Sequence, residues 1–336
     1  MVKKKILLVT DAWTPQINGV AVSLEELKKN LELQGFSVTV VHPGLFNTIP
    51  LPFYSEIKIA LFPERKFGHI LAVEKPDFVH IATEGPLGFV ARAYCIWKKI
   101  SFTTAYHTHF PMYLSLYVTR FAIPKLAYRY LSWFHNGARA TIVHTATLKR
   151  ELESHGFKKT VLCPLGVDTN FFTRNLFPEL PLFVGPVFTY FGRVAKEKNV
   201  EEFLACNLPG TKLIIGDGPE RKRLEIAYKG SAEFVGYKKG QELVDWLSLS
   251  DVLVFPSRSE TFGLVVLEAL ACKIPVAAHD VMGPRDIITS GVDGFLGENL
   301  EEAALQCLSI PKEKCREKAL QFSWENSTRT FIKAIS

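Results

Sequence analysis

PSRSETFGLVVLEALAC, residues 256–272, is the stretch around which the rest of the chain is interpreted. It follows an apolar run at 251–255 that is typical of a short buried strand, and the apolar residues from Gly263 onward suit a helix packed on a sheet. Glu260 therefore lies on the loop at the carboxyl end of the strand, and Glu268 lies inside the helix. Unpaired backbone N–H groups at such a helix start attract an anion, and a carboxylate beside them can bind sugar hydroxyls. A solvated helix start with an ordinary loop acid has the same pattern, so the rest of the chain has to distinguish the two.

Length and composition limit the possible classes of protein. The 336 residues predict two domains of moderate size. The formal net charge of +6 fits an anionic substrate or an anionic lipid surface, but it is too small to indicate nucleic acid. The six cysteines form no C-x-x-C pair and no metal-ligand spacing, which is typical of reduced thiols in a cytosolic protein.

The N-terminal string MVKKKILLVTDAW has too few apolar residues for a signal peptide and predicts a first strand instead. No run in the chain approaches the ~18 apolar residues of a membrane span. We expect a cytoplasmic protein that would meet a membrane only from the cytoplasmic face.

Strand-like and helix-like segments alternate along the chain, as in parallel sheets with helices on both faces. In the first half the expected strands are 5–10, 37–42, 77–81, 102–106 and 141–144, and the expected helices are 22–33, 87–98 and 125–134. Turn residues and prolines at 164–186 predict an interdomain linker. The second half repeats the pattern, with strands expected at 187–191, 212–215, 233–235, 252–255 and 275–278.

The tail from Lys312 is expected to be helical, with Trp324 anchoring the last helix on a domain surface. The sequence thus predicts an α/β protein with domains at 1–175 and 176–336, with packing of the last helix back on the N-terminal domain as one option. Their parallel sheets would face across a cleft at the carboxyl ends of the strands.

The loop after the first strand contains Asn18 and Gly19. A glycine there lets the backbone approach a phosphate closely, although a plain turn explains the pair equally well. Neither this loop nor the string at 216–219, GDGP, is a G-x-G-x-x-G motif, and no Walker A string occurs. These absences argue against a dinucleotide oxidoreductase and a P-loop nucleotidase.

The loop after the strand at 187–191 carries two cations. Arg193 keeps its charge and can clamp a diphosphate through two hydrogen bonds, and Lys198 adds a second cation near the next helix start. Considered alone, a solvated loop is the more common explanation, because Glu197 lies beside both. If the loop faces that of Glu260, a diphosphate site becomes the better explanation.

His107 follows the strand at 102–106, where it can bond a substrate hydroxyl or take part in proton movement. Asp11, at another strand end, could reach an acceptor hydroxyl. His109 completes a His-x-His pair, which is weak support for zinc without a third ligand. Three other histidines are interpreted as structural residues at strand ends: His42, His80 and His144.

Aromatic and basic residues are mixed between Pro111 and Phe134, as on a membrane-interface face. The aromatic members are Tyr113, Tyr117, Phe121, Tyr128, Tyr130, Trp133 and Phe134, and the basic ones are Arg120, Lys125 and Arg129. A core-facing helix with ordinary tyrosines explains the segment at least as well. Single-stranded nucleic acid is a third possible partner that nothing else in the chain supports.

No Asp-x-Asp string occurs in the chain. Single-domain sugar transferases commonly hold the diphosphate through a metal bound to that motif. Here Arg193, Lys198 and a helix N-terminus would supply the countercharge, so we expect neither a metal nor a cofactor.

In combination, these motifs resemble the retaining glycosyltransferases of family 4, which have the GT-B fold of two Rossmann-like domains. The resemblance covers nearly the whole chain. It rests on Asn18-Gly19, FGRVAKEKN at 191–199, the turn at 234–236, the E-x7-E pair in PSRSETFGLVVLE, and MGPRDII at 282–288.

The strings TDAWTPQINGV, TEGPLGFVARAYC and FTTAYHTHFP look like a bacterial branch of that family. The branch contains GDP-mannose-dependent α-mannosyltransferases and sulfoquinovosyl or glucosyl transferases that build glycolipids. The chain departs from many relatives at Asn18-Gly19, where they have Gly-Gly, and at Gly35-Phe36, where they have Gly-His.

The resemblance implies catalytic roles for Glu260, His107, Arg193, Lys198 and Asp11. Glu260 would lie against the donor sugar, His107 would contact that sugar, and the two cations would hold the diphosphate.

The resemblance also implies residues that would bind the donor without taking part in the reaction. Glu268 would bind the ribose, the turn at Val235 would hold the base, and Gly19 would belong to the phosphate loop. The backbone along one further stretch would touch sugar and phosphate: Thr261, Phe262, Gly263 and Leu264.

The expected activity is transfer of a hexose, with GDP-mannose favoured as donor, to a hydroxyl of a lipid or glycolipid, with the α-configuration retained. The N-terminal domain would bind the acceptor and the C-terminal domain the nucleotide sugar, with peripheral contact to an anionic membrane and no nucleic-acid partner. One alternative is a glucosyl- or sulfoquinovosyl-type glycolipid synthase that uses a UDP-sugar. The others are a nucleotide-sugar epimerase on the same fold and a degenerate binding module without activity.

Overall fold

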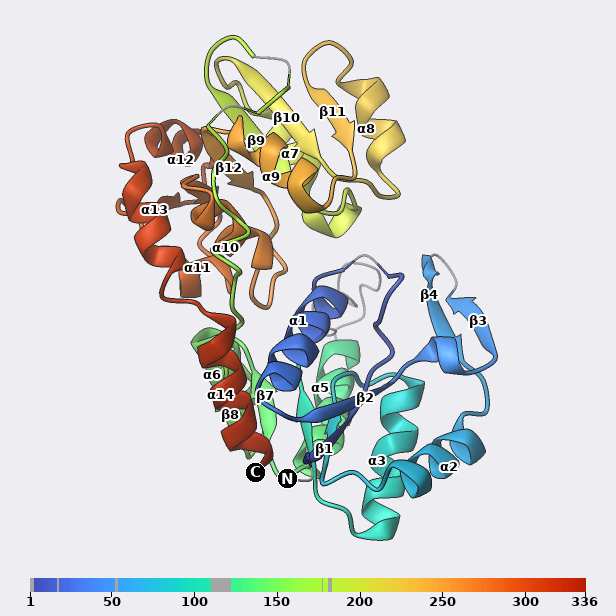
Figure 1. The fold of residues 1–336 in the computed structure, drawn as a ribbon. Coiled ribbons are helices and arrows are strands. Elements are labelled where there is room, and N and C mark those ends of the chain that lie inside the picture. The colour runs from blue at the N-terminus through green and yellow to red at the C-terminus, as the bar shows by residue number, and fades with distance from the viewer. Residues whose placement is uncertain (1–2, 17, 52–53, 110–121, 177, 181–182) are drawn as a thin grey trace. The chain divides into compact units, whose positions relative to one another are not determined.

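The computed structural model describes residues 3–16, 18–51, 54–109, 122–176, 178–180 and 183–336, and it forms two compact units (Figure 1). The N-terminal unit consists of Met1–Pro164 together with Trp324–Ser336, and the C-terminal unit consists of Leu165–Ser323. The chain therefore returns to its first unit at the end, and each unit is described by itself below.

The chain passes from the N-terminal to the C-terminal unit after Pro164, which is earlier than the boundary at residue 175 that the sequence pattern predicts. Part of the expected linker bonds to the C-terminal unit, which explains the difference. The Asn175 N–H donates to Ser248 Oγ at 2.8 Å, and Arg174 donates to the Ser250 carbonyl at 3.1 Å. Hydrogen bonds of this kind hold a segment to the body it contacts, whatever its turn-rich composition.

A parallel sheet forms the centre of the N-terminal unit. In the described part of the chain its strand order is β2-β1-β5-β6-β7-β8. The strands are β1 (Lys5–Val9), β2 (Ser37–Val41), β5 (Phe78–Ile81), β6 (Phe102–Ala105), β7 (Thr141–Val143) and β8 (Thr160–Leu162). The strands expected in this half are confirmed, whereas the pattern predicts neither β8 nor the antiparallel pair β3 (Thr48–Leu51) and β4 (Tyr54–Ala60).

Helices cover both faces of this sheet, because successive residues of a strand point to opposite faces. The helical elements are α1 (Gly19–Leu33), η1 (Pro43–Leu45), α2 (Glu64–Glu74), α3 (Pro86–Lys98), α5 (Ala122–Asn136), α6 (Ala146–Ser154) and α14 (Trp324–Ile335). Leu7 and Val9 of β1 pack in the core with α2, α3 and α5, whereas Ile6 and Leu8 pack with α1 and α14.

The helical tail expected from Lys312 is present as α13 (Lys312–Ala319) and α14. In the N-terminal unit the Phe331 ring of α14 lies 4.8 Å from the ring of His80, edge to face. Trp324, at the start of α14, is buried. Among the described residues no helix is both long and apolar enough to cross a membrane.

The C-terminal unit is built on a second parallel sheet, whose order among the described residues is β11-β10-β9-β12-β13-β14. The strands are β9 (Val187–Phe191), β10 (Thr211–Ile215), β11 (Glu233–Gly236), β12 (Val252–Phe255), β13 (Val276–Ala278) and β14 (Gly294–Leu296). The helical elements before α13 are η2 (Lys196–Lys198), α7 (Val200–Ala205), α8 (Arg221–Ala227), α9 (Gly240–Ser248), α10 (Leu264–Ala271), α11 (Pro284–Ile287) and α12 (Leu300–Cys307). All five strands expected in this half are confirmed, and β14 is additional.

Each sheet has one position at which the strand order reverses. In the N-terminal sheet it lies between β1 and β5, and in the C-terminal sheet between β9 and β12. Loops that leave the carboxyl ends of two such strands turn away to opposite sides and leave room for a ligand. The loops that carry Asp11, Arg193, Lys198 and Glu260 all start at these two positions.

Gly88 in α3 lies so close to the loop before the helix that a Cβ atom there would sit 1.9 Å from the Thr83 carbonyl oxygen. Replacing glycine by alanine normally stabilises a helix by about 1 kcal/mol. We expect Gly88→Ala to lower the free energy of unfolding instead, by ~2 kcal/mol or more, because the backbone has to move. Urea denaturation measures this change.

The matched control is Gly68→Ala in α2, where the new Cβ would meet only the outer end of the Tyr94 side chain. That variant should unfold close to the wild-type midpoint. An unchanged midpoint for Gly88→Ala would contradict the packing described here.

Candidate active site

The loops after β9 and β12 are joined by an ion pair between Lys198 Nζ and Glu260 Oε1. The two side chains are 21% and 13% exposed, so much of the pair is removed from water. Ser257 Oγ donates a second hydrogen bond to Glu260 Oε1 at 3.1 Å. A partly buried carboxylate needs such partners, because desolvation without compensation is costly. The structure thus brings together the two residues that the sequence analysis placed on facing loops.

Two glycines after β10 pack closely against the backbone of the Lys198 loop. A Cβ atom on Gly216 would lie 1.8 Å from the Gly192 carbonyl oxygen, and one on Gly218 would lie 2.3 Å from the Val194 carbonyl oxygen. The Val194 N–H also donates to the Asp217 carbonyl at 2.9 Å. The string at 216–219, considered in the sequence analysis only as a nucleotide motif, therefore packs the neighbouring loop by backbone contact.

Arg193 lies two residues beyond β9 on the same loop as Lys198, and its side chain is half-buried. Its carbonyl accepts a hydrogen bond from Tyr190 Oη at 2.6 Å, which ties the loop to the strand. Val235 is half-buried near the carboxyl end of β11, on the same edge of the sheet. The candidate diphosphate residues and the candidate base turn thus lie along one edge.

The helix start after Glu260 has the backbone that its sequence predicts. Gly263 is the N-cap of α10 with φ of +94°, in the left-handed region that favours glycine. Phe262 before it is buried, whereas Thr261 and Leu264 are half-buried. Gly283, in the motif MGPRDII, packs against this loop, because a Cβ atom there would lie 2.8 Å from the Phe262 carbonyl oxygen.

Glu268 lies on α10 and is half-buried. Among the described residues no side chain or N–H donates a hydrogen bond to its carboxyl group. Burial raises the pKa of that carboxyl from its ordinary value of 4.5 to about 7. The described part of the chain therefore keeps a partly buried acid on the helix that follows the Glu260 loop and gives it no hydrogen-bond donor.

Asp11, in the N-terminal unit, caps the start of α3. Its carboxylate accepts hydrogen bonds from Thr83 Oγ1 at 2.8 Å and from the Leu87 N–H at 3.1 Å. Burial raises the pKa of Asp11 and these hydrogen bonds oppose the shift. The structure thus gives Asp11 a structural task in addition to the predicted contact with the acceptor.

The first loop ends in a helix cap. Asn18 Oδ1 accepts a hydrogen bond from the Ala21 N–H at 2.9 Å, and Gly19 is the exposed first residue of α1. The asparagine side chain thus satisfies an N–H group that a glycine at this position would leave open.

His107 is placed just beyond β6, with its Nδ1 3.0 Å from His144 Nε2. His109, two residues later, contacts Glu151 of α6 at 2.8 Å, and Tyr128 of α5 donates to the same carboxylate. This cluster joins the loop after β6 to α5 and α6. Within the described part of the chain, no group of three or more His, Cys, Asp or Glu side chains could hold a metal ion.

Part of the predicted aromatic and basic segment, residues 110–121, lies outside the described residues. In α5, Phe134 is buried, whereas Tyr130 and Trp133 are exposed together with Lys125 and Arg129. The segment therefore combines the two alternatives, a core-facing helix and a surface with aromatic and basic groups.

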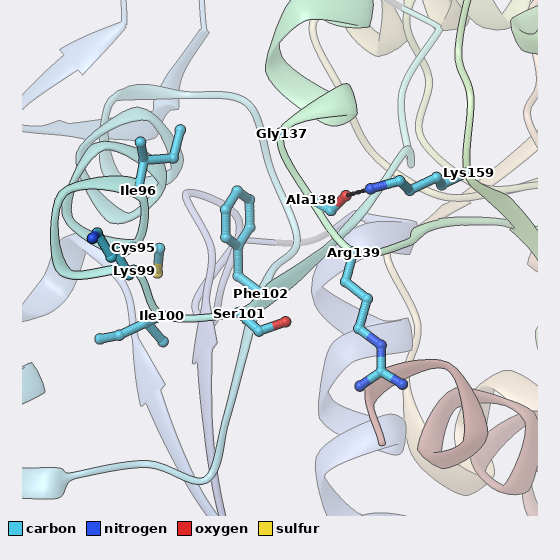
Figure 2. A pocket seen from close by; sticks show the side chains of 10 residues that line it. All are labelled: Cys95, Ile96, Lys99, Ile100, Ser101, Phe102, Gly137, Ala138, Arg139 and Lys159. Carbon is cyan, nitrogen blue, oxygen red and sulfur yellow. Dashed lines mark hydrogen bonds between the residues drawn. The ribbon is translucent and has the colours of Figure 1, made fainter.

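A hollow of about 350 Å³ lies at the other end of the N-terminal sheet (Figure 2). Its lining residues precede β6, β7 and β8 in the chain or, in the case of Phe102, begin β6, so it opens at the amino ends of these strands. Lys159 donates to the Ala138 carbonyl at 3.4 Å, and Arg139 donates to the Ser336 carbonyl at 2.5 Å. The hollow is therefore separate from the candidate residues, which follow the carboxyl ends.

Two family models match the chain. The one described as Glycosyltransferase Family 4 matches residues 17–171, and the one described as Glycosyl transferases group 1 matches residues 185–310. The second range contains the joined loops of Lys198 and Glu260. The chain belongs to the family 4 glycosyltransferases.

Relatives of this glycosyltransferase differ in the sugar that their names give. Sulfoquinovosyl transferase SQD2 of Arabidopsis thaliana is 31% identical over 269 residues, which is 74% of this chain and 52% of that protein. This chain thus spans about half the length of that relative. A GDP-mannose-dependent alpha-mannosyltransferase of Mycobacterium tuberculosis is 28% identical, covering 87% of this chain and 83% of that protein. Alpha-monoglucosyldiacylglycerol synthase of Acholeplasma laidlawii is 25% identical, covering 98% and 94%.

The fold of this glycosyltransferase matches that of sucrose-phosphate synthase from Thermosynechococcus elongatus. The TM-score is 0.79 at 18% identity, with 98% of each chain covered. At this identity the likeness establishes the fold alone. The expected GT-B architecture of two Rossmann-like domains is confirmed.

The raised pKa of Glu268 predicts a pH-dependent stability. Between about pH 4.5 and 7 the folded chain holds the proton of Glu268 more tightly than the unfolded chain, so the free energy of unfolding falls as pH rises through this range. Glu268→Gln removes this contribution. The free energy of unfolding of the variant minus that of wild type should therefore increase by about 2 kcal/mol from pH 5 to pH 8. Urea denaturation at the two pH values measures this difference.

The control is Glu233→Gln, which replaces an exposed glutamate at the start of β11. Its stability should follow the wild-type pH profile. A Glu268→Gln profile parallel to wild type would show that the Glu268 carboxyl titrates normally.

Proposed function

We propose that this glycosyltransferase moves a hexose from a nucleoside diphosphate sugar to an acceptor hydroxyl and retains the α-configuration. The observation that carries this proposal is the partly buried pair of Lys198 and Glu260 where the loops after β9 and β12 meet. A diphosphate is bound by cations and sugar hydroxyls are bound by carboxylates. One pair of side chains thus offers both kinds of partner at adjacent positions.

In this proposal Lys198 and Arg193 hold the diphosphate. Breaking the bond between sugar and diphosphate increases the negative charge on the leaving group, and fixed cations stabilise that charge. The N–H groups at the start of α10, beyond Gly263, add a second source of positive potential. These groups would supply the countercharge without a metal or a cofactor.

The remaining donor contacts follow from placement and resemblance. Glu268, which lacks a donor among the described residues, would accept hydrogen bonds from the ribose, and Val235 would border the base. Glu260 would leave Lys198 in part to contact the sugar. The backbone at 261–264 would lie along sugar and phosphate, and Gly19 along the phosphate.

In the N-terminal unit, His107 would bond a hydroxyl of the donor sugar and Asp11 would reach the acceptor hydroxyl. Oδ1 of Asp11 already accepts from the Leu87 N–H at the start of α3, and Oδ2 accepts from Thr83 Oγ1 in the loop before it. A catalytic Asp11 would therefore use the remaining acceptor capacity of its oxygens.

GDP-mannose is the favoured donor, because the name of the Mycobacterium tuberculosis relative contains it and the match to that relative covers most of this chain and most of the relative. A UDP-sugar-dependent glucosyl- or sulfoquinovosyl-type synthase is the second candidate, favoured by the names of the Arabidopsis and Acholeplasma relatives.

The Acholeplasma name also supports a lipid or glycolipid acceptor. The exposed aromatic and basic residues of α5 would then allow peripheral contact with an anionic membrane from the cytoplasmic side.

Lys198→Ala should reduce kcat/KM about hundredfold, because it removes a cation from the leaving diphosphate and leaves Glu260 without its partner. Lys196→Ala is the matched control, since Lys196 lies on the same turn with the same charge but is exposed. It should change kcat/KM less than about threefold. Equal losses in the two variants would contradict the role of Lys198.

Thermal unfolding with GDP, UDP and ADP identifies the nucleotide. A nucleotide present at about 100 times its Kd should stabilise the chain by about 2.7 kcal/mol, and Glu268→Ala should abolish most of this effect. Stabilisation by GDP supports a mannosyl donor, and stabilisation by UDP supports the second candidate. No stabilisation by any of the three would contradict the proposed donor site.

Turnover then separates transfer from the other activities considered. Consumption of the donor that requires an acceptor is expected, with an α-linked product seen by NMR. Sugar epimerisation without acceptor would contradict transfer, as would tight nucleotide binding with no turnover on any acceptor class.

A further inference from the structure

Three residues stand in a row beyond the ends of β6, β7 and β8. The parallel registers of these strands, continued past their last paired residues, place His107 beside His144 and His144 beside Cys163. Neighbouring strands in a sheet lie about 4.8 Å apart, so side chains that follow them in register can contact each other. The row is therefore a direct consequence of strand pairing.

Hydrogen bonds run along the whole row. His144 Nδ1 lies 2.8 Å from the carbonyl oxygen of Cys163, and His144 Nε2 lies 3.0 Å from Nδ1 of His107. The two imidazole rings are 4.7 Å apart between centroids. His144 is only 5% exposed, so these contacts are largely shielded from solvent.

The chemistry of these groups determines where the protons are. A carbonyl oxygen only accepts, so His144 carries its proton on Nδ1. A neutral imidazole has a single N–H, so His144 Nε2 accepts and His107 must donate from Nδ1. Nε2 of His107 is then the nitrogen without a proton.

Both rings are neutral at physiological pH. Burial lowers the pKa of His144 to about 4, and burial together with the neighbouring histidines lowers the pKa of His107 well below its ordinary value. A second proton on either ring is therefore disfavoured, and the assignment of one N–H to each ring holds.

We propose that His144 is a positioning residue, which holds His107 in the tautomer whose Nε2 accepts a hydrogen bond from a hydroxyl of the donor sugar. This inference rests on the proposed function, in which His107 contacts that sugar. The tautomer of a histidine is set by the hydrogen bond that its other nitrogen makes. Nε2 of His107 is covered by other atoms in the structure, so the sugar hydroxyl has to displace them, and a hydrogen bond formed in such surroundings is stronger than one in water.

Two variants of His144 separate its two hydrogen bonds. In His144→Asn the amide N–H₂ matches the position of Nδ1 and can still donate to the Cys163 carbonyl, but the side chain is too short to reach His107. In His144→Gln the amide oxygen matches the position of Nε2 and can still accept from His107. A residue that acts only through packing would not distinguish these variants in this way.

The first measurement is the tautomer of His107, by NMR of the full chain with nitrogen-15 in its histidines. In wild type and His144→Gln, Nδ1 of His107 should carry the proton and Nε2 should not. In His144→Asn, His107 should exchange between its two neutral tautomers. A wild-type His107 protonated on Nε2, or an unchanged tautomer in His144→Asn, would overturn the proposal. This measurement needs no turnover, so it remains informative even if the proposed function fails.

The second measurement compares binding of the sugar nucleotide with binding of the free nucleoside diphosphate. His144→Asn should lower kcat/KM about tenfold, mainly through KM for the donor, and leave the affinity for the nucleoside diphosphate unchanged. His144→Gln should restore kcat/KM to within about threefold of wild type. Equal losses of affinity for both ligands would overturn the proposal.

His80→Gln is the matched control. His80 is also fully buried at the centre of this sheet, but it bonds Thr103 Oγ1 at 2.9 Å and has no hydrogen bond in the row. This variant should lower stability and leave the His107 tautomer as in wild type. A changed tautomer in this control would mean that loss of packing alone releases His107, which would also overturn the proposal.

Discussion

The ion pair of Lys198 and Glu260 is the contact on which the account of the C-terminal unit depends. Each charge would be costly to keep partly buried without the other, so the pair holds the loops after β9 and β12 at a fixed separation. In the proposed function an incoming diphosphate would compete with Glu260 for Lys198, which would couple the binding of the phosphate to the release of a carboxylate toward the sugar. A site in which Lys198 and Glu260 did not contact each other would have neither the fixed separation of the two loops nor this coupling.

Close backbone contact is the second constraint, and both units use it at the carboxyl edge of the sheet. In the C-terminal unit Gly216 lets the loops after β9 and β10 touch, and Gly283 lets the motif MGPRDII rest on the Glu260 loop. In the N-terminal unit a Cβ atom on Gly85 would lie 2.5 Å from Asp11 Oδ2. The absence of side chains at these positions therefore allows charged residues to be held by short, stiff loops.

Most strands could be predicted from the sequence because they are buried apolar runs between turn residues. The strands β8 and β14 have three residues each and are only partly buried, so they lack a pattern. The pairing of Lys198 with Glu260 could be foreseen, since loops beyond adjacent parallel strands share one edge. The role of His144 could not be foreseen, because it depends on how β6, β7 and β8 are aligned with one another. A single sequence does not specify that alignment. The return of α14 to the N-terminal unit was one option in the prediction, and contacts such as Phe331 with His80 are what hold it there.

A crystal structure of the full chain with a bound nucleoside diphosphate, GDP first and UDP second, tests the central claim most directly. The account predicts the diphosphate beside the start of α10, with Lys198 Nζ and Arg193 within hydrogen-bond distance of its oxygens and Glu268 on the ribose hydroxyls. A diphosphate bound elsewhere, or one bound there while Lys198 stays paired with Glu260 and touches no phosphate oxygen, would contradict it.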